Sequence, residues 1–499
     1  MKNPALLSCT TLLLWSLCAA AQPAAASAST AAPESTLQAR ISRVEQGLST
    51  RIVVKGSPER RMALEQRMAF HRVPAVSIAL IDQGRIAWAR AYGVADAASQ
   101  QPATTTTRFQ AGSISKPLSA LGALRLVEQG RLSLDADANA NGQLASWKIP
   151  QNAFTRAGTI NLRRLLNHGA GVTVHGYDGY APGQPLPTLL QVLDGIAPAN
   201  SEPVRVDIAP GSAWRYSGGG YSIVQLMMTE ASGQPFDRYL ETAVLQPLGM
   251  AHSTYAVPPP ESVASQAGAA HDGNGQVLAG RWRLYPESAA AGLWSTPSDL
   301  AQVILEVQRA EAGGPGSILS RDMVSTMLTR GLGEYGLGFF VEDLGDRTSF
   351  SHSGGTEGFR SQLYGYTRSG QGAVIMTNSI NGAALIDEIL CSIAAEYGWP
   401  EFQVVEKTAI PTDVATNRLL AGDYRLLDQP AHVVAEGERL YFQSDLFGAG
   451  RMELFRESED SFFMTAQDMR IRFRQDGAGT IAGFDLVRGA GTYAAHRTR

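Results

Sequence analysis

The pattern of apolar residues changes after Pro400, and this change requires two structural units of different kinds. Before it, segments with strand periodicity and helix periodicity alternate. After it, short segments of period-two alternation recur about every eight to twelve residues, separated by turn pairs such as Asp476-Gly477. A run of this kind is typical of an antiparallel barrel or sandwich. We therefore expect a linker over residues 401–417 and a small C-terminal antiparallel β-barrel domain over residues 418–499.

Residues 46–400 predict a larger domain of the α/β (α+β) class. Residues 76–81 and 86–92 are apolar and flank Asp82-Gln83-Gly84-Arg85, which indicates a β-hairpin. Helical segments follow at residues 118–127 and 221–232, each closed by a glycine. The apolar strand 372–378 and a helix around Cys391 come last. Because strands stand at both ends with helices between them, we expect the first and last strands to meet in one antiparallel sheet.

The N-terminus has the pattern of a secretory signal peptide. Lys2 precedes an apolar run over residues 5–21, and Ala19-Ala20-Ala21 offers a cleavage site. An uncleaved membrane anchor is the alternative, but the run holds fewer than ~18 uninterrupted apolar residues. We expect residues 1–21 to be removed on export, most simply to a bacterial periplasm, leaving no stable membrane span. Residues 22–45 are rich in Ala, Ser and Pro and predict a flexible tether.

Cysteine content and charge exclude several other classes of protein. Removal of the signal peptide leaves Cys391 alone, so an intramolecular disulfide is impossible. Its apolar helical surroundings indicate a buried structural thiol rather than a nucleophile. A net charge of −4 and the alternation over residues 470–474, which fits a solvated strand face, argue against a nucleic-acid partner. His168, His175 and Asp178 lie close in sequence but lack the register of a metal site, so we expect no metal and no cofactor.

Ser113-Ile114-Ser115-Lys116 is the first segment that indicates chemistry. Residues three apart share one face of a helix, and Pro117 is tolerated only in a first helical turn. At a helix start, the macrodipole favours an anion on Ser113 and disfavours a cation on Lys116. A desolvated Lys116 could then be neutral and accept the serine proton. A capping serine beside a solvated lysine is the alternative, so the motif needs further support.

That support comes from two further motifs, which follow in order along the chain. Residues 210–221 read Pro-Gly-Ser-Ala-Trp-Arg-Tyr-Ser-Gly-Gly-Gly-Tyr, and residues 352–355 read His-Ser-Gly-Gly. Supporting segments are residues 165–169, 247–250 and 292–300. Over about residues 45–400 the chain resembles the serine β-lactamase and penicillin-binding protein superfamily, in its class C-like branch with DD-peptidases and esterases. The C-terminal domain resembles the lipocalin-like β-domain often fused behind such hydrolases.

The resemblance implies a role for each matching residue. Ser113 would be acylated, Lys116 and Tyr216 would share the proton transfers, and sequence leaves open which of the two is the dominant base. The backbone N–H groups of Ser113 and Gly355 would form the oxyanion hole. The remaining matches imply contacts with substrate, and these residues are Ser217, Gly218, His352, Ser353 and Gly354.

Two departures from the family pattern bear on the substrate. Gly218 stands where the family has an Asn that holds the substrate's acyl side chain, and His352 replaces a lysine that binds a carboxylate. Bound as an imidazolium, His352 would hold acidic substrates only below pH ~6.5. We therefore expect an exported serine hydrolase that acts on small ester, amide or peptide substrates, D-amino-acid peptides included. The alternatives are a β-lactamase or D-Ala-D-Ala carboxypeptidase and, in another class, a non-catalytic sensor of wall peptides or β-lactams. The oligomeric state is not predicted.

Overall fold

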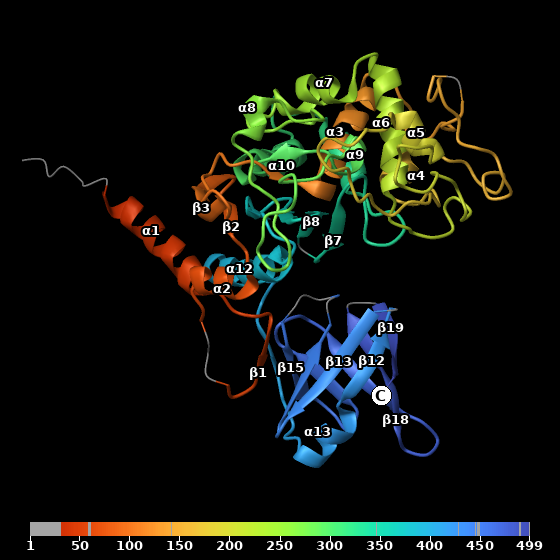
Figure 1. The fold of residues 1–499 in the computed structure, drawn as a ribbon. Coiled ribbons are helices and arrows are strands. Elements are labelled where there is room, and N and C mark those ends of the chain that lie inside the picture. Colours follow the sequence, from red (N-terminus) through yellow and green to blue (C-terminus); the bar gives the residue numbers. More distant parts are fainter. Residues whose placement is uncertain are drawn as a thin grey trace, which may run out of the picture.

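The computed structural model describes residues 31–57, 61–140, 142–345, 347–427, 429–444, 446, 450–488 and 491–498. The predicted signal peptide lies outside these residues. Within the described part of the chain, no helix combines the length and apolarity that crossing a membrane requires. Figure 1 shows a mixed α/β body and a separate barrel.

A seven-stranded sheet forms the centre of the larger domain, in the order β4-β3-β2-β10-β9-β8-β7. The predicted hairpin is present, and β10 pairs antiparallel with β2, so the expected meeting of first and last strands is confirmed. The strands, in chain order, are β2 (Ala75–Asp82), β3 (Arg85–Asp96), β4 (Gln101–Pro102), β7 (Phe340–Asp343), β8 (Thr348–Thr356), β9 (Phe359–Tyr366) and β10 (Gly372–Thr377).

Helices cover both faces of this sheet because β2 and β10 are apolar on both. Ile78 and Leu80 point into one core with α1 (Ala31–Gln46), α2 (Leu64–His71) and α12 (Gly382–Tyr397). Ala79 and Ile81 point into the other. That second core contains α3 (Ser115–Glu128), α4 (Leu162–Leu166), α5 (Leu189–Asp194), α6 (Gly218–Ser232), α7 (Phe236–Leu240), α8 (Glu261–Ala264), α9 (Ser288–Ala291), α10 (Pro297–Glu311) and α11 (Arg321–Leu328). A period of two along a strand places successive side chains on opposite faces, which explains the two cores.

Short elements complete the larger domain. The strands β5 (Phe109–Gln110) and β6 (Trp294–Ser295) pair with each other, and β5 leads into the 3₁₀ turn η1 (Gly112–Ile114). A π-helical turn, η2 (Glu241–Leu245), follows α7. The pairing of β5 with β6 joins the segment that carries Ser113 to a segment far along the chain.

The flexible tether predicted over residues 22–45 is wrong from residue 31 onward, where the chain forms α1. Ile41 and Val44 are 3% and 2% exposed, and α1 packs against α12. Arg40 and Arg43 pair with Glu396 at the C-terminal end of α12. The Ala- and Ser-rich composition suggested a tether, but Leu37, Ile41 and Val44 have the spacing of a helix face.

The C-terminal unit is a closed barrel of eight strands, and the expected strands within residues 440–474 are all present. Its strands are β12 (Gly422–Leu426), β13 (Gln429–Glu436), β14 (Arg439–Gln443), β15 (Met452–Arg456), β16 (Ser461–Met464), β17 (Arg470–Gln475), β18 (Ile481–Arg488) and β19 (Gly491–Arg497). The barrel encloses an apolar cluster that includes Tyr424, Phe442, Phe473 and Phe484.

The predicted linker contains two ordered elements. The strand β11 (Val405–Lys407) pairs in parallel with β1 (Ile52–Val54), and α13 (Val414–Leu420) packs against β13. The backbone N–H of Ile410 donates to Arg456 O at 2.8 Å, and Lys407 Nζ lies 4.0 Å from Glu457 Oε1. The segment therefore connects the α/β body to the barrel through hydrogen bonds and an ion pair.

Candidate active site

Ser113 and Lys116 lie together where η1 passes into α3. Lys116 Nζ is 3.0 Å from Ser113 Oγ and 2.9 Å from the carbonyl oxygen of Ala290. The lysine is 2% exposed, although it lies only three residues from the half-buried serine. The predicted spacing of a hydroxyl and an amine thus produces a direct contact.

Serine side chains hold this turn against α9 and the residues after it. Ser115 Oγ donates to Gly112 O at 2.6 Å and accepts from the N–H of Leu293 at 3.0 Å. Ser119 Oγ donates to Ser115 O at 2.8 Å and also contacts Ala289 O at 3.1 Å. These bonds fix residues 289–293 beside α3, so the Ala290 carbonyl stays within reach of Lys116.

Burial changes the protonation of Lys116. Loss of hydration lowers the pKa of its amine from 10.5 to about 7. The amine is therefore substantially neutral at neutral pH, and a neutral amine can accept the proton of Ser113. Its carbonyl partner Ala290 carries no full charge that would restore the ammonium form.

Tyr216 lies beside the lysine on the segment that precedes α6. Lys116 Nζ is 4.8 Å from the centroid of the Tyr216 ring. Burial raises the pKa of the Tyr216 phenol above its ordinary value of 10.0, although a hydrogen bond with Ser113 acts in the opposite direction. Burial thus makes this phenol harder to ionise, whereas it makes the Lys116 amine easier to deprotonate.

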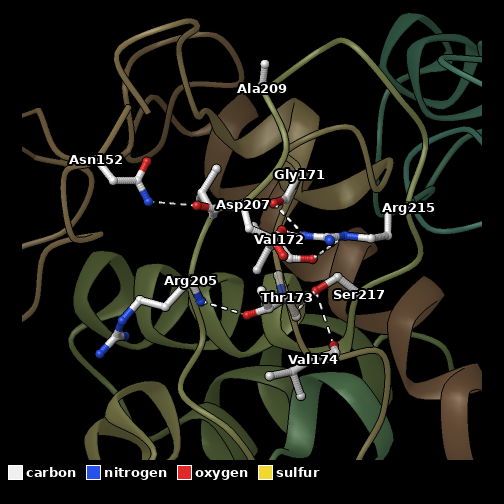
Figure 2. A network of polar contacts seen from close by, with 12 residues as sticks. Asn152, Gly171, Val172, Thr173, Val174, Arg205, Asp207, Ala209, Arg215 and Ser217 are labelled. Atoms are coloured by element: carbon white, nitrogen blue, oxygen red, sulfur yellow. Dashed lines mark hydrogen bonds and ion pairs between the residues drawn. The ribbon is translucent and has the colours of Figure 1, made fainter. Parts of the chain in front are cut away.

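Arg215 and Ser217, the residues on either side of Tyr216, are hydrogen-bonded to residues 171–174 (Figure 2). Arg215 donates through Nη2 to Gly171 O at 2.7 Å and through Nε to Val172 O at 3.1 Å, and it also pairs with Asp207. Ser217 Oγ donates to Thr173 O at 2.7 Å. Since both neighbours are anchored, the position of the Tyr216 ring is set by the adjoining loop.

The strand β8 approaches the serine through glycine backbone. A Cβ built on Gly112, whose φ is +53°, would lie 2.7 Å from Gly355 N. A Cβ on Gly354 would lie 1.9 Å from Ala111 O. Only glycine permits these approaches. They bring the backbone N of Gly355 next to the turn that carries Ser113, as an oxyanion hole would require.

His352 lies in the wall of the site with both nitrogens occupied, which overturns its expected role as an imidazolium. Its Nδ1 is 2.6 Å from Ser353 O and its Nε2 is 2.9 Å from the hydroxyl of Tyr335. The residue is 1% exposed, and burial, followed by the charge of Lys116, lowers its pKa to about 3. A neutral imidazole that already has two partners cannot bind a substrate carboxylate by charge.

Ser217 and Gly218 also lie differently from what was expected of substrate-contacting residues. Ser217 is the N-cap of α6, where its Oγ accepts from the N–H of Gly220 at 2.9 Å. A Cβ on Gly218 would lie 3.1 Å from the ring of Tyr177. Both residues are buried and neither lines the cleft. Of the residues predicted in the His-Ser-Gly-Gly segment, His352, Ser353 and Gly355 reach the cleft, whereas Gly354 packs on Ala111.

A cleft of about 530 Å³ opens over Ser113. Sequence reasoning missed four of its lining residues as parts of the site, and they are His175, Trp214, Arg215 and Phe340. Trp214 and Arg215 directly precede Tyr216, so their place in the motif was an available signal. The sequence positions of Phe340 and His175 offered no such signal, because only the fold brings these residues to Ser113. The walls are mainly aromatic, with the Arg215 guanidinium already engaged by Asp207 and backbone carbonyls.

His168 and Cys391 have structural positions. His168 Nδ1 accepts from the N–H of Ser217 at 3.1 Å, and its ring lies 4.3 Å from that of Tyr216 between centroids. Cys391 is 2% exposed in α12, and burial raises the pKa of its thiol to about 12. Among the residues that the structure describes, no group of three or more His, Cys, Asp or Glu is arranged to hold a metal ion.

Comparisons with known proteins show which proteins the chain is similar to. A penicillin-binding protein of Bacillus subtilis (strain 168) is 24% identical over 83% of this chain and 93% of its own length. The esterase EstB of Burkholderia gladioli is 30% identical over 50% of this chain and 64% of its own. The D-amino acid amidase of Ochrobactrum anthropi SV3, 19% identical, shares the fold with a TM-score of 0.55 over 72% of this chain and 99% of its own.

A family model described as Beta-lactamase matches residues 61–387. The matched range contains Ser113, Lys116, Tyr216 and the strand that carries Gly355. Together with the mixed α/β fold and the relatives above, it establishes a protein of the serine hydrolase superfamily. The chain belongs to the beta-lactamase family.

Proposed function

We propose that the protein is an exported serine hydrolase that forms an acyl-enzyme on Ser113, with uncharged esters as its preferred substrates. The observation that carries the proposal is the desolvated Lys116 amine, 3.0 Å from Ser113 Oγ. Export rests on the sequence pattern of residues 1–21. The similarity to an esterase and to an amidase supports ester or amide hydrolysis at low identity.

In the proposed reaction, Ser113 Oγ attacks the acyl carbon while its proton passes to Lys116 Nζ. The negative oxygen of the tetrahedral intermediate accepts hydrogen bonds from the backbone N–H groups of Ser113 and Gly355. The leaving alkoxide takes a proton from Tyr216, whose phenol keeps its proton at neutral pH, and Lys116 reprotonates Tyr216. Water then attacks the acyl-ester and gives its proton to Lys116. As the bond between the acyl carbon and Ser113 Oγ breaks, Lys116 passes this proton to Ser113 Oγ and the acid is released.

The lining of the cleft favours uncharged substrates. Trp214, Tyr216 and Phe340 supply apolar surface, and no Asp or Glu is among the described residues that line it. An ammonium group next to the scissile bond would therefore lack a carboxylate partner. A substrate carboxylate would meet the neutral His352 and an Arg215 that is already paired. Esters thus rank ahead of D-amino-acid amides, D-Ala-D-Ala peptides and β-lactams.

Labelling with a fluorophosphonate tests the nucleophile. We expect the mass of one probe on Ser113 in the wild type and none in Ser113→Ala. A folded wild-type protein that takes up no probe would refute the acyl-enzyme and favour the non-catalytic sensor.

A substrate panel tests the ester preference. It comprises p-nitrophenyl esters, D-amino-acid amides, D-Ala-D-Ala peptides and nitrocefin, each with Ser113→Ala as the blank. We expect the highest kcat/KM on the esters. A higher value on the peptides or on nitrocefin would replace the ester by that substrate class while keeping the nucleophile.

A further inference from the structure

The loop of residues 173–177 fills the space beside the start of α6. A Cβ on Gly218 would meet the ring of Tyr177 at 3.1 Å and the carbonyl oxygen of His175 at 3.3 Å. The Tyr177 hydroxyl is fixed by a hydrogen bond of 2.7 Å with Ser222 Oγ in α6. No side chain from residue 218 can therefore enter the cleft. The loop is the element that borders this side of it.

A strained residue within this loop orients His175. Val174 has a φ of +61°, in the left-handed region that β-branched residues almost never adopt. Its carbonyl oxygen accepts from the N–H of Gly219 at 3.0 Å and from Ser217 Oγ at 3.3 Å. The His175 carbonyl accepts from the N–H of Gly218 at 3.0 Å. The start of α6 thus holds a conformation that costs energy, and such strain concentrates at functional sites.

The side chain of His175 projects into the catalytic cleft with unused hydrogen-bonding capacity. It is exposed, it lines the cleft with Ser113, and its ring lies 5.0 Å from that of Tyr216 between centroids. Within the described part of the chain, its nitrogens make no hydrogen bond. Partial burial and the charge of Lys116 lower its pKa, so the imidazole is neutral at neutral pH. A neutral imidazole offers one donor and one acceptor.

The other imidazole and the guanidinium that line the cleft are occupied, whereas the Trp214 indole offers a donor alone. His352 is held by Tyr335 and Ser353, and Arg215 by Asp207 and the carbonyls of residues 171 and 172. His175 therefore differs from both in being exposed and unpaired. A substrate that lies across Ser113 and Tyr216 must pass next to it.

We propose that His175 is a specificity residue that hydrogen-bonds a polar, uncharged substituent of the substrate near the scissile ester. This inference rests on the proposed function and deepens it. The enzyme then prefers esters that carry an ether, carbonyl or hydroxyl oxygen within a few bonds of the reacting carbon. Esters of plain hydrocarbon chains are hydrolysed with a lower kcat/KM.

Matched substrate pairs test this preference. For the acyl side we choose p-nitrophenyl methoxyacetate and p-nitrophenyl butyrate, which differ by one oxygen in place of a methylene. For the alcohol side we choose 2-methoxyethyl acetate and n-butyl acetate. The ratio of kcat/KM within a pair, compared between enzyme variants, cancels the intrinsic reactivity of the esters.

His175→Phe keeps a ring and removes both nitrogens, whereas His175→Gln keeps a donor and an acceptor. In at least one pair, we expect the polar-to-apolar ratio to fall about 3- to 10-fold in His175→Phe, as for the loss of one neutral hydrogen bond. The same ratio should stay within about twofold of the wild type in His175→Gln. His432→Phe, at an exposed histidine of the barrel, is the matched control and should change neither ratio.

Unchanged ratios in His175→Phe would overturn the proposal. It would equally fail if His175→Gln behaved like His175→Phe, because ring packing would then set the preference. Fluorophosphonate labelling separates this failure from that of the proposed function. A wild type that is labelled on Ser113 and hydrolyses esters with unchanged ratios refutes only the role of His175, whereas an unlabelled wild type refutes the acyl-enzyme.

Discussion

The hydrolase domain and the barrel bury different kinds of side chains. In the hydrolase domain, Lys116, His168, His352 and Glu287 are each at most 2% exposed. Burial raises the pKa of Glu287 to about 7, although a hydrogen bond with Tyr180 acts in the opposite direction. In the described part of the barrel, by contrast, the buried polar side chains are Ser444 and Ser461, and the interior is aliphatic and aromatic.

This difference indicates which of the two units contains buried groups that lower its stability. Burying a titratable group costs free energy unless the group is paired or loses its charge, so such groups are retained chiefly where chemistry needs a shifted pKa. The barrel follows the ordinary rule for a small closed sheet, with a packed interior and charge pairs outside, such as Arg474 with Asp485. We infer that the barrel is optimised for stability and the region around Ser113 for reactivity.

The sharpest test of this comparison is Lys116→Met, which removes the buried amine but keeps its apolar stem. We expect kcat/KM on esters to fall by about 10²- to 10⁴-fold, the usual contribution of a positioned acid or base. For the wild type, kcat/KM should rise with pH and level off above about 7, as Lys116 loses its proton. A rate that is still rising at pH 10 would transfer the role of base to Tyr216, whose pKa lies above 10.

The same variant should be more stable than the wild type, and the gain depends on pH. The pKa of Lys116 is about 7 when folded and near 10.5 when exposed, so between these values the unfolded chain binds more protons. Wild-type stability therefore rises with pH through this window, while the burial penalty is complete below pH 7. Urea unfolding at pH 6 and pH 10 should show the larger gain at pH 6. Lys148→Met, at an exposed lysine, is the control and should show no such gain.

In the barrel, Phe484→Ala should affect stability alone. The ring is fully buried against Tyr424, Phe442 and Phe473. Its removal should lower the free energy of unfolding of the barrel by about 3–5 kcal/mol, measured by urea denaturation. We expect kcat/KM on p-nitrophenyl acetate to stay within about twofold of the wild type, because none of the barrel residues that the structure describes lines the cleft. A proportional loss of activity would show that the barrel shapes the site.

Gly218→Asn tests how tightly the reactive region is packed. The new side chain would collide with Tyr177, so we expect destabilisation by about 1–3 kcal/mol in a thermal or urea melt. Adding Tyr177→Ala should relieve part of this loss by opening space at residue 218. If the single variant is as stable as the wild type, the loop of residues 173–177 can move aside more easily than its contacts indicate.

The smallest effect is expected from Cys391→Ala. The thiol is buried in α12 among residues such as Leu390 and Ile393, away from the cleft. Truncation should cost about 1 kcal/mol in urea unfolding and leave ester hydrolysis unchanged. Because burial raises its pKa to about 12, a thiol reagent should modify the native protein at pH 8 far more slowly than the unfolded chain. Loss of hydrolysis in Cys391→Ala would contradict a purely structural thiol.

Local pattern was sufficient for much of the fold. The β2–β3 hairpin, α3, α6 and the strands of the barrel follow from periodicity and turn residues, and each is formed by one continuous stretch of chain. The contact of Ser113 with Lys116 was predictable for the same reason, since a helical turn brings residues three apart together. The ordered elements within the predicted linker and tether were not foreseen, because these segments are rich in polar or small residues. The segments against which they pack lie elsewhere in the chain.

Sequence by itself determined the order of the motifs, the family and the change from a mixed domain to a barrel, because these depend on neighbouring residues. The tertiary structure decided the chemistry of the site. Lys116 loses its charge because residues 174 positions away enclose it and offer only a carbonyl oxygen. His352 is neutral because burial lowers its pKa, and its nitrogens are occupied by Tyr335 and Ser353. His175 enters the cleft because α6 holds a strained loop. Burial and pairing of this kind arise only when distant segments pack together, which no local pattern records.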